Sequence, residues 1–385
     1  MPGVPSRGRT VSFHRHQPDA YETAAPERKT NLTLGRRAFS QVLIASASTS
    51  TGLALGCRHR ERFQVRVRGS SMNPTLWGHH RLMVCQSCRV ETRVDESIIA
   101  AHLEKTTHGE SRCWHCGGVF TDEQIRTSRS FNCDTISIST DQTDDARSGD
   151  LIVYRNDNRG LSLKRILGRP GDQIDRSATG KLLNVTHGHS RVVSSHPPAP
   201  IPIDFDDHRC ESRWDAMPRG PKRNVIERSK EGEWSWPRTL DSSVIKLQYQ
   251  HRNVHRDNRA ISWSDDRPGN IGLSRQLYPI DQIRLTALIR FCDQNEWQPW
   301  QHACDVLDPK GRVAIRFDAS KIAGVKRLRI DRPVASVDHR TDHASRYPIR
   351  LASDEWFVVG DNPPTSIDSR QLGPIKTSQI VGVSV

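Results

Sequence analysis

The sequence predicts a mainly β protein in which short strands alternate with turns. Phe63, Val65 and Val67 alternate with polar residues, the period-two pattern of a half-buried strand. Residues 151–167 place two short apolar runs on either side of a polar turn, as a β-hairpin does. Further short apolar runs recur after residue 176, and 385 residues leave room for two or three structural units.

The composition excludes a polytopic membrane protein. Only 35% of the residues are hydrophobic and 26% are charged, whereas such a protein needs several long apolar spans. The net charge of +13 would permit contact with nucleic acid or an anionic membrane surface. Because the Arg residues are spread along the chain and no basic recognition helix follows Cys116, we expect no nucleic-acid partner.

The N-terminal part divides into two segments. Residues 1–37 are rich in Pro, Arg, Thr and Ser without apolar periodicity, which predicts a disordered basic segment. Residues 38–57 carry no charge, and 20 such residues just cross a hydrocarbon core of about 30 Å. Six of them are Ser or Thr, which weakens insertion. Three interpretations stay open: a single membrane anchor, a twin-Arg leader that starts at Arg36, and a surface helix.

Residues 58–84 predict two strands around a polar turn. The turn contains Ser71, followed by Met72 and Pro74. By itself, a lone Ser in a turn is most often only a turn residue. A serine nucleophile needs a base, and a buried Lys with a lowered pKa can provide one.

Residues 85–120 contain two CxxC pairs among the nine cysteines of the chain. Thiolates with this spacing are typical of a zinc-ribbon-like site that holds a structural Zn²⁺, and the alternative is two disulfides in an oxidising compartment. A catalytic zinc is not expected, because four thiolates close the coordination sphere. The candidate ligands are Cys85, Cys88, Cys113 and Cys116.

Residues 121–175 include the predicted hairpin, whose second strand carries Lys164. In that strand Lys164 shares a face with Ile166, and Arg165 points to the other face. Taken alone, a Lys in an apolar strand is best explained as a surface residue whose amine reaches water.

The C-terminal half predicts a long insert and a final short segment. Residues 176–350 include β-type runs at 244–249 and 282–291 and six of the nine Trp, which predicts a separate core. Residues 351–385 return to short apolar runs around a polar turn, in which Asp368 and Arg370 could form an ion pair.

Four separate stretches, in order, resemble the signature boxes of type I signal peptidases, the Ser-Lys membrane peptidases that remove leader peptides. The stretches are GSSMNPTL at 69–76, GDLIVY at 149–154, KRILGRPGD at 164–172 and GDNPPTSIDSRQLG at 360–373. The resemblance implies a β-rich catalytic core made of residues 58–84, 121–175 and 351–385. A small zinc-ribbon-like insert, 85–120, and a larger β-rich insert, 176–350, would interrupt this core.

The same resemblance assigns roles to individual residues. Ser71 would be the nucleophile and Lys164 the general base, with no cofactor for catalysis. Ser366 would orient Lys164, and Asp368 with Arg370 would fix the last loop. The implicated residues are Ser71 and Lys164 for catalysis, with Met72, Asp361, Ser366, Asp368 and Arg370 in support.

The expected function is therefore a membrane-associated serine endopeptidase that removes signal peptides from exported preproteins. It would lie at the inner membrane as a single-pass protein with its catalytic domain on the outer side. Two alternatives remain: a related Ser-Lys peptidase that processes one specific partner, and a zinc-containing binding module that has lost turnover. The presence of both Ser71 and Lys164 favours an enzyme.

Overall fold

The chain divides into two units, Met1–Arg37 and Ala38–Val385, and all described residues lie in the second. The computed structural model describes residues 43–44, 62–103, 110–157, 160–186, 189–192, 201–206, 213–217, 226–237, 244–254, 258–263, 268–271, 280, 282–305, 310–333, 336–338 and 341–385. The predicted disordered segment 1–37 lies outside these residues, as does the candidate anchor 38–57 except for Leu43–Ile44. Within the described ranges, no helix is long and apolar enough to cross a membrane.

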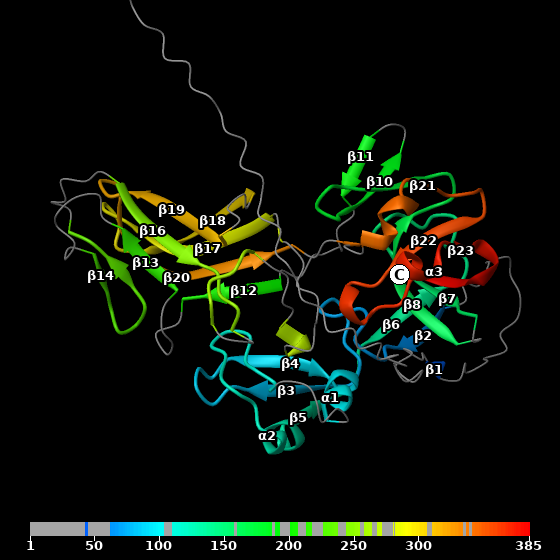
Figure 1. Ribbon diagram of the computed structural model, residues 1–385, viewed down its shortest axis with the longest axis horizontal. Helices are drawn as coiled ribbons and strands as arrows, with labels where there is room; N and C mark the ends of the chain where they lie inside the picture. Colours follow the sequence, from blue (N-terminus) through cyan, green and yellow to red (C-terminus); the bar gives the residue numbers. More distant parts are fainter. Residues whose placement is uncertain are drawn as a thin grey trace, which may run out of the picture. The chain divides into compact units, whose positions relative to one another are not determined.

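The mainly β prediction is confirmed, and the largest sheet has eight strands (Figure 1). Its neighbours all pair antiparallel, in the order β1-β2-β6-β24-β7-β8-β22-β23. The strands are β1 (Leu43–Ile44), β2 (Arg62–Arg66), β6 (Thr135–Ser139), β24 (Ile380–Ser384), β7 (Leu151–Arg155), β8 (Leu161–Gly168), β22 (Glu355–Val359) and β23 (Ile375–Lys376). Residues from both ends of the sequence therefore complete one sheet.

The predicted hairpin is the centre of this sheet, because β7 and β8 pair in register from Leu151↔Arg165 to Arg155↔Leu161. Apolar side chains fill both of its sides: Ile152 and Ile166 belong to one buried cluster, and Leu163 belongs to another. A strand buried on both faces can hold a charged side chain away from water.

A four-stranded sheet, ordered β11-β10-β9-β21, forms the base of the long insert. Its strands are β9 (Gln173–Arg176), β10 (Leu182–Thr186), β11 (His189–Val192) and β21 (Ile349–Arg350). Strand β9 follows the hairpin and pairs directly with β21, which precedes β22. The two ends of the intervening 172 residues between Arg176 and Ile349 are thereby held together.

The cysteine-bearing module is a three-stranded sheet with two short helices, and it includes residues on both sides of 85–120. Its elements are β3 (His80–Val84), β4 (Glu91–Asp95), β5 (Arg129–Phe131), α1 (Glu96–Leu103) and α2 (Asp122–Thr127). Helix α2 begins with a capping box in which Thr121 and Gln124 satisfy each other's backbone N–H groups. Met83, Val94 and Ile125 pack with the cysteines in one buried cluster.

The remaining strands of the insert form two sheets that share one core. The strands are β12 (Ile201–Phe205), β13 (Trp214–Met217), β14 (Glu227–Arg228), β15 (Trp234–Ser235), β16 (Val244–Gln250), β17 (Gln282–Phe291), β18 (Trp297–Asp305), β19 (Arg312–Asp318) and β20 (Ile322–Arg332). One sheet is β14-β15-β20-β17-β18 with β12 on β20, and the other is β13-β16-β19. Leu285 and Val325 of the first sheet pack with Trp214 and Leu247 of the second, so the insert has the separate core that its Trp content predicts.

Candidate active site

Ser71 lies in the turn that follows β2. The chain folds back there through hydrogen bonds from Asn73 N to the Ser70 carbonyl at 3.2 Å and from Thr75 N to the Met72 carbonyl at 2.9 Å. Met72 is buried in a cluster that includes Leu163 of β8. Its side chain therefore fixes the turn against the core of the sheet, while Ser71 itself is 4% exposed.

Lys164 is buried within β8, opposite Ile152 of β7. Burial lowers the pKa of its amine to about 8, although the nearby Asp368 carboxylate opposes that effect. The side chain is only 4% exposed, so the interpretation of Lys164 as a residue that reaches bulk water is wrong. The physical reason is that residues some 200 positions later in the chain cover this strand, which the local sequence does not reveal.

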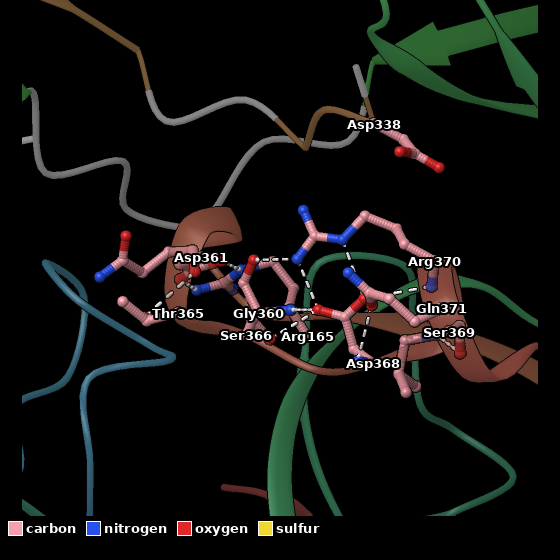
Figure 2. Close-up of polar contacts among 12 residues, drawn as sticks. Arg165, Asp338, Gly360, Asp361, Thr365, Ser366, Asp368, Ser369, Arg370 and Gln371 are labelled. Atoms are coloured by element: carbon pink, nitrogen blue, oxygen red, sulfur yellow. Dashed lines mark hydrogen bonds and ion pairs between the residues drawn. The ribbon is translucent and has the colours of Figure 1, made fainter. Parts of the chain in front are cut away.

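Asp368 organises the last loop, as Figure 2 shows. Its carboxylate accepts hydrogen bonds from Ser366 Oγ at 2.6 Å and from Gly360 N at 2.8 Å. Arg370 donates to both carboxylate oxygens, so the predicted ion pair is confirmed. Although burial tends to raise the pKa of Asp368, Arg370 outweighs it and holds this pKa below its usual value. Asp368 is therefore a buried anion that faces Lys164 and Ser366.

The loop that contains Asp368 is short and closely capped. It includes η4 (Pro363–Thr365) and α3 (Ser369–Leu372), and Asp368 is the N-cap of α3. Arg370 also donates to the carbonyl groups of Gly360 and Val337. The ion pair thus fixes both ends of the loop rather than only its tip.

Gly360 is the point where the nucleophile turn and the last loop meet. A Cβ on this residue would collide with Ser366 Oγ and would lie 2.6 Å from the Ser71 carbonyl oxygen. Asn362 then donates from its backbone to the Ser71 carbonyl at 2.9 Å and from its side chain to the Ser70 carbonyl at 3.0 Å. Only a residue without a side chain fits between these two segments.

Ser71, Ser366 and Asp368 thus surround Gly360, and Asp368 acts electrostatically on Lys164. In the part of the chain that the structure describes, neither Ser71 Oγ nor Lys164 Nζ forms a hydrogen bond. A free active site commonly has such loose geometry and tightens only when substrate binds.

Two functional neighbours escape the sequence argument. Arg165 forms a buried ion pair with Asp361 through bonds of 2.8 and 2.6 Å and also donates to the Gly149 carbonyl. This pair connects the strand of Lys164 to the loop of Asn362 (Figure 2). The signal that could have revealed it is the charged residue beside Lys164 in a strand that is otherwise apolar.

The second such neighbour is Asn270, which belongs to the long insert. It lies at the end of η2 (Pro268–Asn270) and is 1% exposed. Its side-chain oxygen accepts a hydrogen bond from Asn362 Nδ2 at 3.0 Å. No local pattern in the sequence marks it.

The four cysteines of the two CxxC pairs come together. Their sulfur atoms all lie within 4.8 Å of one another, with Cys85 and Cys116 3.5 Å apart and Cys88 and Cys113 3.7 Å apart. Sulfurs at the corners of a tetrahedron around zinc, with Zn–S bonds of about 2.3 Å, are separated by roughly 3.8 Å. The cluster is compatible with a structural Zn²⁺, and no disulfide joins any two of the four sulfurs.

Comparison with known proteins identifies the sheet that carries this site. The model of a family described as "Signal peptidase, peptidase S26" matches residues 40–185 and 320–385. The matched ranges include every residue of the proposed catalytic set and the cysteine module, and they leave out most of the long insert. No curated protein in the comparison matches the chain.

Proposed function

The chain belongs to the signal peptidase family, peptidase S26, and we propose that it is a membrane-associated serine endopeptidase that removes N-terminal signal peptides from exported preproteins. Ser71 would be its nucleophile and Lys164 its general base. One observation carries the proposal: the strand beside this site holds a buried Lys whose pKa is lowered to about 8. Family membership supports the coarser statement, a serine peptidase hydrolase that acts on substrates with signal peptides.

The first chemical step uses the neutral form of Lys164. Ser71 Oγ attacks the scissile carbonyl carbon while its proton passes to Lys164 Nζ. With a pKa of about 8, about one amine in ten is neutral at pH 7, whereas an unperturbed Lys would leave fewer than about one in a thousand. The buried position of Lys164 therefore makes this proton transfer feasible at neutral pH.

The negative charge that develops on the carbonyl oxygen needs a donor. The Ser71 backbone N–H has no acceptor among the described residues, so it is available for that oxygen. The residue two positions earlier is Gly69, which supplies no hydroxyl group. Asn362 and Gly360 hold the Ser71 carbonyl from the other side and keep the N–H oriented.

The second half of the reaction returns the enzyme to its starting state. Protonated Lys164 gives its proton to the leaving amine, which becomes the new N-terminus of the mature protein. Lys164, neutral again, then takes a proton from a water molecule that attacks the ester between Ser71 and the signal peptide. It gives that proton to Ser71 Oγ as the ester bond breaks and the signal peptide leaves as a carboxylic acid. Ser366, which Asp368 holds, would orient the amine through both steps.

Zinc has a structural part in this proposal. Cys85, Cys88, Cys113 and Cys116 would hold one Zn²⁺ and stabilise the module, and no chemical step passes through the metal. The module connects to the insert through His115, whose Nδ1 lies 2.9 Å from Asp204 Oδ1.

The experiment that tests the function is cleavage of a leader-bearing preprotein by purified protein. We expect Ser71→Ala and Lys164→Ala each to abolish cleavage, with Lys376→Ala as control because its amine pairs at the surface with Asp354 and Glu355. Cleavage by Lys164→Ala at near the wild-type rate would exclude Lys164 as the base. A wild-type protein that binds the preprotein without cleaving it would instead support the binding-module alternative.

The membrane association is also a proposal, and topology tests it. We propose that residues 38–57 anchor the chain in the inner membrane and that residues 63–385 lie on its outer side. Protease added to intact spheroplasts should then digest the catalytic region. If that region stays intact until the membrane is broken, it lies in the cytoplasm and the proposed orientation is wrong.

A further inference from the structure

A buried carboxylate that takes no part in the proposed reaction steps, Asp338, lies beside Arg370. Figure 2 shows Asp338 on one side of the Arg370 side chain and Asp368 on the other. Asp338 is 3% exposed. Although burial tends to lower the pKa of Arg370, Asp368 and then Asp338 outweigh it and raise this pKa. Arg370 is therefore a buried cation that faces two carboxylates, and only one of them belongs to the last loop.

Two side chains of the long insert hold the Asp338 carboxylate. Tyr347 Oη donates to Asp338 Oδ2 at 2.8 Å, and His343 Nδ1 lies 3.1 Å from the same oxygen. Burial, and after it the Asp338 charge, raises the pKa of the Tyr347 hydroxyl well above its ordinary value, so this group stays protonated and donates. His343 lies in η3 (Thr341–Arg346), and Tyr347 follows directly. The position of the carboxylate is thereby fixed.

The backbone around Asp338 joins the base of the insert to the last loop. Asp338 N donates to the Gly180 carbonyl at 2.8 Å, and its own carbonyl accepts from Arg176 Nε at 2.6 Å. The neighbouring Val337 carbonyl accepts from Arg370 at 2.9 Å. Arg370 is thus held from the insert by one hydrogen bond and by the charge of Asp338.

The protonation of Lys164 responds to the charges that face it. Burial lowers its pKa to about 8, Asp368 and Asp361 oppose this effect, and Arg370 adds to it. Asp361 is itself paired with Arg165. Because Arg370 is one of these charges, the proton affinity of the amine depends on where Arg370 is held and on any further charge that lies behind it.

We propose that Asp338 is a positioning residue of the active site, which acts on Lys164 through Arg370. Tyr347 and His343 fix its carboxylate, and that carboxylate holds the guanidinium group beside the anion of the last loop. Its negative charge favours the protonated amine at rest. The proposal rests on the proposed peptidase function and adds to it a residue of the long insert that sets the pH range of cleavage.

The pH profile of cleavage tests the charge. Asp338→Asn preserves the shape of the side chain and one acceptor oxygen but removes the negative charge. The pH at which kcat/KM reaches half of its maximum should fall by about half a unit, the effect of one charge at about 10 Å and an effective dielectric constant of about 40. Asp206→Asn is the matched control, because the buried Asp206 carboxylate pairs with Arg228 elsewhere in the insert, and its profile should match the wild type.

A second pair of variants tests the hold on the carboxylate without changing its charge. Tyr347→Phe removes one donor to Asp338 and should lower kcat about fivefold, the factor that one neutral hydrogen bond of about 1 kcal/mol gives. KM and the half-maximal pH should stay unchanged. Tyr249→Phe is the control, because that hydroxyl lies beside His251 in the core of the insert. If Asp338→Asn does not fold, this pair decides: an unchanged kcat in Tyr347→Phe would overturn the proposal.

Chemical denaturation reports the charge on Lys164 without turnover. The gain in free energy of unfolding from Lys164→Met measures how strongly folding disfavours the protonated amine. At pH 6 this gain should be about 0.7 kcal/mol larger in the Asp338→Asn background, which is the half-unit shift at 1.36 kcal/mol for each unit. Such a change without any cleavage by the wild type would support the role of Asp338 and refute the peptidase function. If neither the gain nor the pH profile changes in folded Asp338→Asn, or if Asp206→Asn changes them equally, the proposal is wrong.

Discussion

Replacing Lys164 by Met should abolish activity and at the same time stabilise the folded protein at neutral pH. The amine is buried, and burial lowers its pKa from an ordinary 10.5 to about 8. Folding therefore favours the uncharged amine. Below pH 8 the buried amine is mostly protonated in the folded protein, and this charge lowers the free energy of unfolding. Met fills a similar volume without that charge.

The size of the effect follows from linkage. A lowering from 10.5 to about 8 corresponds to about 3.4 kcal/mol, at 1.36 kcal/mol for each factor of ten. Between these two pH values the unfolded chain binds more protons at Lys164 than the folded chain does, so the wild type gains stability as pH rises. The free energy of unfolding of Lys164→Met should exceed that of the wild type by about 3 kcal/mol at pH 7, and this difference should disappear by about pH 10.5.

The assay is chemical denaturation of both proteins at several pH values from 6.5 to 10.5. The difference in the free energy of unfolding between the two proteins cancels the contribution of every group that titrates alike in both. Lys376→Met is the control, because that Lys is exposed and its pKa is raised by Asp354 and Glu355 rather than lowered. If Lys164→Met is no more stable than the wild type at pH 7, or if the difference does not change with pH, the buried-amine argument is wrong.

Three further outcomes follow from the same site. First, kcat/KM should rise about tenfold for each pH unit below 8 and level off above it, because only neutral Lys164 accepts the proton; a flat profile from pH 6 to 9 would contradict this. Second, Gly360→Ala should lower kcat about a hundredfold by displacing the Ser71 turn, whereas Gly160→Ala, whose Cβ meets its nearest atom at 3.4 Å, should stay near wild type; normal rates in both would show that the contact at Gly360 is not needed. Third, metal analysis should find about one zinc per chain, lost in Cys88→Ser but kept in Cys292→Ser, since four sulfurs form one site; disulfides within the CxxC pairs would refute it.

Local patterns predict the strands of this protein because short apolar runs between polar turns record which stretches are buried. The hairpin of β7 and β8 and the strands β16 and β17 lie where these runs place them. The gathering of the four cysteines also follows from spacing, since a CxxC turn brings two thiolates to one point. Both features depend on residues that are near neighbours in the sequence.

The parts that sequence reasoning missed depend on contacts between distant residues. Arg165 and Asp361 are separated by 196 positions and Asn270 and Asn362 by 92. The residues that flank each of these four in the sequence give no indication of its partner. The same distance explains Lys164: a Lys between apolar residues suits a solvent-reaching surface position or a buried one, and only the covering loop decides which.

The long insert can interrupt the catalytic sheet because the strands at its two ends pair with each other. Strands β9 and β21 pair through Ile174↔Ile349 and Gln173↔Arg350, so the chain leaves and returns at one place. The entropic cost of such an excursion grows only slowly with its length. Yet the insert is more than an appendage, because Asn270 completes the hydrogen bonding of buried Asn362, which holds Ser70 and Ser71. A buried amide that loses such a partner costs about 1–3 kcal/mol, so the position of the nucleophile turn depends on a segment far outside the catalytic sheet.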